Sequence, residues 1–280
     1  MAYCPSCDVT RDEGQFCAEC GTELIQPDES APSDPDPHEA YGLFEFSLRY
    51  PFASGLGPTV LGAGLTLLSI LILPYFMLLG YGFQLGRASA RGDAEPPGAG
   101  DWTAMLRDGV LVVLAPLPIA ILGFAVMGAL WLVAMAAGDT LVVALVTGVI
   151  VLLYLVVAYI AGAILPVLIA TGSVTACYRD LLVLRFALSK QYLVGFVVLL
   201  LVQLLIWTVI MTIVSMVSVV LILTFIGIIL LLPLFIVTYL LALPYTLFVS
   251  DALWGYVCRE AAEDGALPAV EEEDSLSATL

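Results

Sequence analysis

The sequence predicts an all-α polytopic membrane protein with five to six membrane helices, in two or three hairpins, and a small N-terminal zinc ribbon. Hydrophobic residues make up 61% of the 280 residues and charged residues only 12%, whereas soluble domains carry about 25% charged residues. The charges are also segregated, because four long runs contain no Asp, Glu, Lys, Arg or His. These runs are 50–86, 109–138, 140–178 and 191–250.

The five membrane elements are expected near 57–86, 109–137, 140–165, 192–223 and 228–250. A crossing needs roughly 20 apolar residues, so the last charge-free run is long enough for two. The first element is ambiguous, because Pro74 lies near its middle and would kink or break a helix. Two short helices in a shallow hairpin give six membrane helices, and a single kinked span gives five. The whole membrane domain is predicted to cover 41–260.

The third observation is a cysteine-rich head over residues 1–25. Cys4 and Cys7 form one Cys-x-x-Cys pair, and Cys17 and Cys20 form a second pair after nine intervening residues. Four thiolates can surround one Zn²⁺ ion tetrahedrally, and such a closed site is structural rather than catalytic. A head this short cannot bury a core, so the metal must supply its folding energy. Two disulfides are the alternative, which requires an oxidising compartment.

The head resembles a small prokaryotic zinc ribbon. The sequences Cys-Pro-Ser-Cys at 4–7 and Phe-Cys-Ala-Glu-Cys-Gly at 16–21 carry the resemblance. Asp8 departs from it, because the first knuckle usually has Gly at this position. The resemblance implies contacts with other macromolecules, so we expect the ribbon to dock a protein partner.

Acidic segments flank the membrane domain. Residues 26–40 are rich in Pro and acidic side chains and are predicted to be a disordered linker, and 261–280 a disordered acidic tail. The net charge is −16, with one Lys against eight Arg, a pattern typical of halophiles, whose carboxylates repel little in molar salt. Nucleic-acid binding is not expected, because it requires a basic patch.

The nine basic residues predict the orientation. They lie in the head, two loops and the tail, and the breaks near 138–139 and 225–227 carry none. The positive-inside rule then places both termini in the cytoplasm of a multi-pass protein of the cytoplasmic membrane. No apolar segment precedes the head, so we expect it to stay on the side where it is made.

No catalytic motif is found, and we expect a protein that is not an enzyme and has no catalytic residues. The alternative to partner docking is a transporter for a neutral or lipidic solute. It predicts a cavity lined by Gln203, Tyr154, Tyr159 and Ser215. A third hypothesis is a lipid-modifying enzyme, which would need convergent polar groups. The candidates are Arg87, Asp108, Asp180 and Arg185. The thiols of Cys177 and Cys258 are expected to be buried or idle.

A stretch of sequence over 73–102 resembles the signature of a prokaryotic membrane family, domain of unknown function 4013, which is common in haloarchaea. Gly80-Tyr81, Arg87, Arg91, Glu95-Pro96-Pro97 and Trp102 carry the resemblance, and the turn at 98–100 departs from it. The resemblance covers roughly 42–260. It implies a multi-span membrane protein without an established activity. Some members of this family carry an N-terminal zinc ribbon.

Overall fold

The chain divides between Ala40 and Tyr41 into two units, and each is described by itself. The computed structural model describes residues 2–4, 9–11, 41–98, 100–222 and 225–270. In the first unit, strands β1 (Ala2–Cys4) and β2 (Val9–Arg11) form an antiparallel pair in which Cys4 lies opposite Val9. The other predicted zinc ligands, Cys7, Cys17 and Cys20, and the predicted linker lie outside the described residues. The ribbon therefore stays a prediction.

The second unit is helical throughout its described part. Its longer helices are α3 (Gly57–Leu67), α4 (Ile72–Arg91), α5 (Trp102–Leu114), α6 (Leu117–Ala137), α7 (Thr140–Gly162), α11 (Lys190–Ile222) and α12 (Phe225–Glu263). Its shorter helices are α2 (Leu43–Arg49), η1 (Tyr50–Phe52), η2 (Leu68–Ile70), α8 (Ile164–Thr171), α9 (Val174–Tyr178), η3 (Arg179–Leu181) and α10 (Leu182–Ala187).

Four described helical segments are long and apolar enough to cross a membrane. They are Trp102–Ala137, Thr140–Thr171, Lys190–Ile222 and Ile229–Glu263. Large apolar side chains cover their outer surfaces, and Leu132 and Leu204 are 71% and 66% exposed. Contiguous apolar surface of this kind fits lipid rather than water as its surroundings. The predicted multi-pass α-helical fold is thus confirmed, but four spans replace the predicted five to six.

The count differs because the element near 57–86 adds no full span. The chain breaks at Leu71, whose φ and ψ of −84° and 120° are extended, and not at Pro74. Pro74 lies in the first turn of α4, where a helix loses no hydrogen bond to proline. α3 has only 11 residues, and α4 carries Gln84 and two arginines. The two helices form a short hairpin whose turn exposes Ile72 at 73%.

Two helices extend beyond the limits that charge-free runs suggested. α5 begins at Trp102 rather than near 109, because the side chain of Asp101 accepts hydrogen bonds from the backbone N–H groups of Thr103 and Ala104 at 3.1 and 3.0 Å. α12 continues past 250 to Glu263. The predicted disordered tail from 261 is also corrected in its first part, since Leu267 is only 5% exposed in the hydrophobic core.

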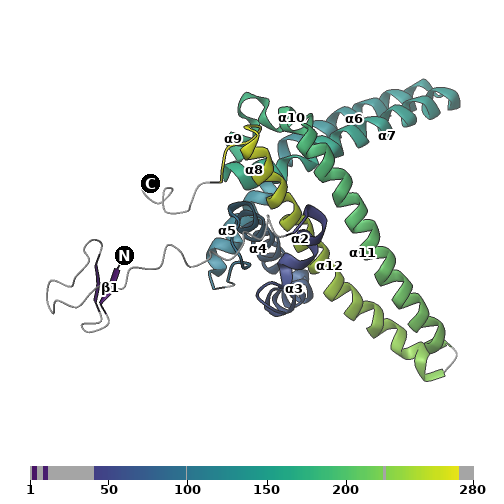
Figure 1. The fold of residues 1–280 in the computed structure, drawn as a ribbon. Coiled ribbons are helices and arrows are strands. Elements are labelled where there is room, and N and C mark those ends of the chain that lie inside the picture. Colours follow the sequence, from purple (N-terminus) through teal and green to yellow (C-terminus); the bar gives the residue numbers. More distant parts are fainter. Residues whose placement is uncertain (1, 5–8, 12–40, 99, 223–224, 271–280) are drawn as a thin grey trace. The chain divides into compact units, whose positions relative to one another are not determined.

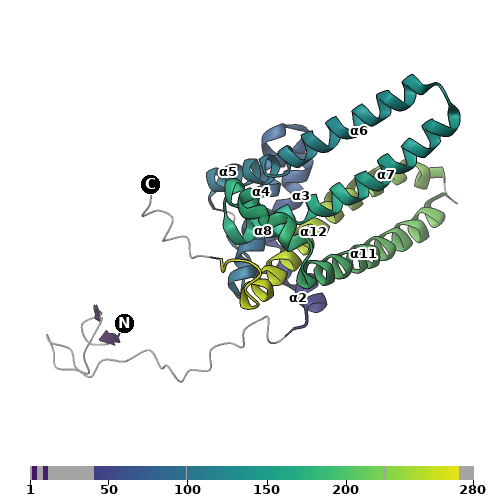
Figure 2. The same cartoon turned by 90° about the horizontal axis from the view of Figure 1, so that it is seen from above.

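Two long hairpins project from a packed base. The base comprises α2–α5, α8–α10 and residues 242–270. The first hairpin is α6 and α7, and the second is α11 with the first part of α12. In Figure 1 the two hairpins diverge, so that their tips lie farther apart than their ends at the base. Figure 2 shows both hairpins on the same side of the base. The fully buried side chains of α4, α8 and α12 gather in the base, so it is here that tertiary packing concentrates.

An aromatic cluster joins the two hairpins where they enter the base. Tyr192 of α11 is fully buried and stacks on Trp254 of α12, with ring centroids 5.2 Å apart. Tyr159 of α7 and Phe186 of α10 meet Tyr192 edge-on. The Tyr192 hydroxyl donates to the backbone carbonyl of Tyr159 at 2.7 Å. The cluster therefore ties the first hairpin to the second through both ring packing and a hydrogen bond.

Candidate functional site

The centre of the base is α4, which approaches α5 closely through glycine. A Cβ built on Gly80 would lie 1.7 Å from the carbonyl oxygen of Met105, and a Cβ on Gly109 would lie 1.8 Å from that of Phe76. Either distance is far below van der Waals contact, so the two backbones touch only because both positions lack a side chain. Small residues allow this kind of close helix contact in membrane proteins.

A second glycine contact lies between α4 and α12. A Cβ on Gly255 would lie 2.2 Å from the carbonyl oxygen of Gly86. Next to it, the Ser89 hydroxyl donates to the carbonyl oxygen of Ala252 at 2.8 Å. α4 is therefore held between α5 on one side and α12 on the other, and its own glycines at 80, 82 and 86 make both contacts possible.

Tyrosines anchor the acidic, proline-containing turn after α4. The hydroxyl of Tyr81 donates to the backbone carbonyl oxygen of Pro97 at 3.1 Å, and that of Tyr50 donates to the backbone carbonyl oxygen of Glu95 at 3.3 Å. Burial raises the pKa of Tyr81 to about 12. Arg91 pairs with Asp93 at 2.8 Å. Several residues of the stretch 73–102, which resembles the family signature, therefore share one structural role. They fix the turn that leads from α4 into α5.

Two carboxyl groups are buried within the base. Asp108 of α5 is 6% exposed and accepts hydrogen bonds from Gln84 at 2.8 Å and Arg107 at 3.3 Å. Asp251 of α12 is 3% exposed and lies against Gly82 of α4. The sequence did not predict the burial of either residue, because each one directly flanks a charge-free run, where a carboxylate is expected to face water. Asp251 and Gly255 are four residues apart and therefore share one face of α12, which is the only signal in the sequence that this face is packed, and it does not name α4 as the facing helix.

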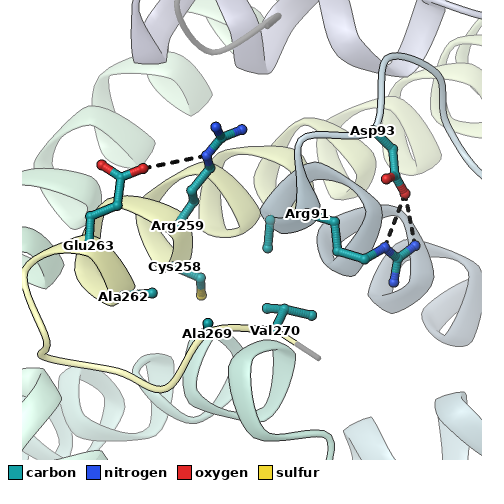
Figure 3. Close-up of a pocket in the computed structure, with 9 residues that line it drawn as sticks. Arg91, Asp93, Cys258, Arg259, Ala262, Glu263, Ala269 and Val270 are labelled. Carbon is teal, nitrogen blue, oxygen red and sulfur yellow. Dashed lines mark hydrogen bonds and ion pairs between the residues drawn. The ribbon is translucent and has the colours of Figure 1, made fainter. Parts of the chain in front are cut away.

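A polar pocket opens at the end of α12, with a volume of about 460 Å³. Its lining residues are Ala90, Arg91, Asp93, Cys258, Arg259, Ala262, Glu263, Ala269 and Val270. Figure 3 shows Arg91 turned to Asp93 and Arg259 turned to Glu263, the latter pair at 3.5 Å. The Cys258 thiol donates to the carbonyl oxygen of Pro166 at 3.0 Å. Each arginine in the pocket thus has its own carboxylate, and the thiol is buried, as predicted.

The four residues of the transporter hypothesis have separate surroundings. Gln203 donates to the carbonyl oxygen of Thr246 at 3.0 Å and to the Ser250 hydroxyl at 2.6 Å, which is an interhelical contact. Tyr154 is 55% exposed on α7. The Tyr159 hydroxyl donates to Ala187 at 2.8 Å. Ser215 lines a surface groove on α11 alone. The structure does not bring these four residues to one cavity.

The four residues of the lipid-enzyme hypothesis are also separated. The guanidinium of Arg87 lies near the end of α8, where a Cβ on Gly172 would be 3.9 Å away. Asp108 faces Gln84 of α4, and Arg185 is exposed on α10. The side chain of Asp180 lies outside the described residues. The three that are described lie on separate elements and have different neighbours.

A metal site is predicted only in the head. Cys4 is the last residue of β1 and pairs with Val9 of β2, and four thiolates are the ligand set that zinc prefers. In the part of the chain that the structure describes, no group of three or more His, Cys, Asp or Glu could hold a metal ion. Zinc binding by Cys4, Cys7, Cys17 and Cys20 therefore stays a prediction.

The fold and the packed base define a multi-pass α-helical membrane protein. The family model described as "Protein of unknown function (DUF4013)" matches residues 65–219, which is more than half of the chain, and the chain belongs to this family. The match begins in α3 and ends in α11, so it is shorter than the predicted 42–260. No curated protein and no solved structure matches the chain.

Proposed function

We propose that this chain is a protein of the cytoplasmic membrane that recruits a protein partner through a cytoplasmic zinc ribbon. The base faces the cytoplasm, and the two hairpins cross the bilayer from it. Four crossings return the chain to the side on which it entered, so Tyr41 and Glu263 share that side. The ribbon, which precedes Tyr41, is then cytoplasmic too.

The distribution of basic side chains supports this orientation. All eight basic residues of the second unit lie in the base or at the first residue of α11. They are Arg49, Arg87, Arg91, Arg107, Arg179, Arg185, Lys190 and Arg259. The turn of the first hairpin, Gly138 and Asp139, contains none, and neither does the sequence 223–224 between α11 and α12. Basic residues accumulate on the cytoplasmic side of membrane proteins, which favours a cytoplasmic base.

The orientation can be tested with single cysteines at opposite ends of the first hairpin. Asp139→Cys and Arg185→Cys place a thiol at the turn and in the base, respectively. In intact cells, a membrane-impermeant maleimide should label Asp139→Cys above the wild-type background and leave Arg185→Cys at that background. After permeabilisation both should react. Labelling of Arg185→Cys alone in intact cells would place the base outside.

The docking role is supported by the chemistry of the predicted zinc site. Four protein thiolates fill the coordination sphere and leave no position for a substrate or water. The separate surroundings of Gln203, Tyr154, Tyr159 and Ser215 give no comparable support to a transporter. A closed site at the end of the chain is better suited to present a protein surface than to perform chemistry.

Removing two thiolates tests the role. In Cys17→Ser/Cys20→Ser, we expect loss of one zinc ion per chain and unfolding of the head, because metal binding and folding are coupled in such domains. Affinity purification from native membranes, with zinc counted in the same eluates, should show a partner that disappears with the zinc. Cys177→Ser, which removes a buried thiol outside the head, is the matched control. Zinc loss with an unchanged set of proteins would contradict docking.

A further inference from the structure

Asp251 lies in the contact between α12 and α4, where the base encloses α12. Its side chain is only 3% exposed. A Cβ on Gly82 would lie 2.1 Å from Oδ2 of Asp251, and a Cβ on Gly86 would lie 3.1 Å from its carbonyl oxygen. The carboxyl group therefore fills space beside the α4 backbone that is open only because residue 82 is glycine.

This carboxyl group differs from the other buried one in its hydrogen bonding. Asp108 accepts from Gln84 and Arg107. Within the described residues, the side chain of Asp251 has no hydrogen-bond donor and no ion-pair partner. An isolated carboxylate charge is very costly to bury, whereas a neutral carboxylic acid is much less so. Ionisable residues in such positions in membrane helices are functional more often than structural.

We propose that Asp251 is a proton-binding site that controls the contact between α12 and α4. The neutral acid fits against Gly82 and keeps the helices together. When the O–H bond breaks, the proton passes to water and the carboxylate keeps the electron pair. The resulting charge has no partner in the contact, so α12 moves away from α4 to admit water.

A proton fits this site better than a metal cation. Hard cations require about six or more oxygen ligands. A Cβ on Gly82 would meet Oδ2 of Asp251 at 2.1 Å and Cδ2 of Leu247 at 3.8 Å, and no described group of three or more His, Cys, Asp or Glu that could hold a metal ion includes Asp251. One carboxyl group in such surroundings can bind a proton without further ligands.

The other titratable or charged groups near this contact do not pair with Asp251. α3 and α8 contain none. Those of α2, η1, α4, α11 and α12 are Glu45, Arg49, Tyr50, Tyr75, Tyr81, Arg87, Arg91, Lys190, Tyr192, Tyr239, Tyr245, Tyr256, Cys258, Arg259, Glu260 and Glu263. Tyr81 and Tyr245 donate to the carbonyl oxygens of Pro97 and Leu48, and Arg91 pairs with Asp93. Asp251 is thus the carboxyl group that the contact itself encloses.

The test is modification by dicyclohexylcarbodiimide, an apolar reagent that reacts with protonated carboxyl groups. The full-length protein in lipid nanodiscs is treated across a pH series and mapped by mass spectrometry. We expect a modified Asp251 peptide at low pH, with modification falling about tenfold for each pH unit above the titration midpoint. The Asp108 peptide is the matched control and should stay unmodified near neutral pH. Absence of modification at Asp251 at every pH, or a rate independent of pH, would overturn the proposal.

A second measurement separates titration from its effect on packing. Cys258 lies two turns along α12 and is 1% exposed. Its reaction with a maleimide at alkaline pH should be several-fold faster in the wild type than in Asp251→Asn, which stays neutral. Comparison at one pH removes the effect of pH on the thiol. Equal rates in the two proteins would show that the charge on Asp251 does not open the contact.

Discussion

Gly80→Ala should prevent α4 and α5 from packing and should abolish most of the folded protein. The new methyl group would lie 1.7 Å from the carbonyl oxygen of Met105, and a backbone atom cannot rotate away as a side chain can. Overpacking usually costs about 1–3 kcal/mol, and here a whole helix must move, so we expect a cost at or above the upper end. Monodisperse yield in detergent and thermal unfolding followed by circular dichroism measure it.

Gly128→Ala provides the matched control. Gly128 is also a helical glycine in the second unit, and a Cβ on it would meet no atom within 4 Å. Alanine is a better helix former than glycine by about 1 kcal/mol, so this variant should be as stable as the wild type or more so. A Gly80→Ala protein that unfolds at the wild-type temperature would contradict the close contact between α4 and α5.

Tyr192→Ala should separate the two hairpins at the base. The side chain is fully buried and stacks on Trp254, and removing a buried aromatic ring costs about 3–5 kcal/mol. Tyr192→Phe keeps the ring and loses only the hydrogen bond to the Tyr159 carbonyl, which is worth about 0.5–1.5 kcal/mol. Unfolding in a denaturing detergent, followed by tryptophan fluorescence, should rank the wild type, Phe and Ala proteins in that order.

Tyr154→Ala serves as the control for ring removal. This tyrosine is on α7, in the same hairpin as Tyr159, but it is 55% exposed. Its loss should change the free energy of unfolding by no more than about 0.5 kcal/mol. If Tyr154→Ala were as damaging as Tyr192→Ala, the effect would come from ring loss on the hairpins in general and not from the cluster.

Particular elements show how far sequence reasoning reached. The charge-free runs located all four spans, because a spanning helix is recognised by its length and apolarity alone. They placed the start of α5 too late and the end of α12 too early, because α5 begins at a local cap, Asp101, and the end of α12 is covered by the base. The helix break was also predicted at the wrong residue, Pro74. Proline breaks the interior of a helix but is accommodated in its first turn, and the extended backbone at Leu71 shows that Pro74 lies in the first turn of α4.

The sequence by itself determined the class of protein, the location of the four long apolar segments that form spans, the thiol set predicted to bind zinc, and the family. These follow from composition, run length and short motifs, which are local properties. Only the tertiary structure decided that α4 is the central helix and that Asp251 is buried against it. Ser89 and Ala252, which meet in that contact, are 163 residues apart in the chain. Contacts of this kind depend on which helix faces turn toward each other, and glycine spacing within one helix does not name its partner.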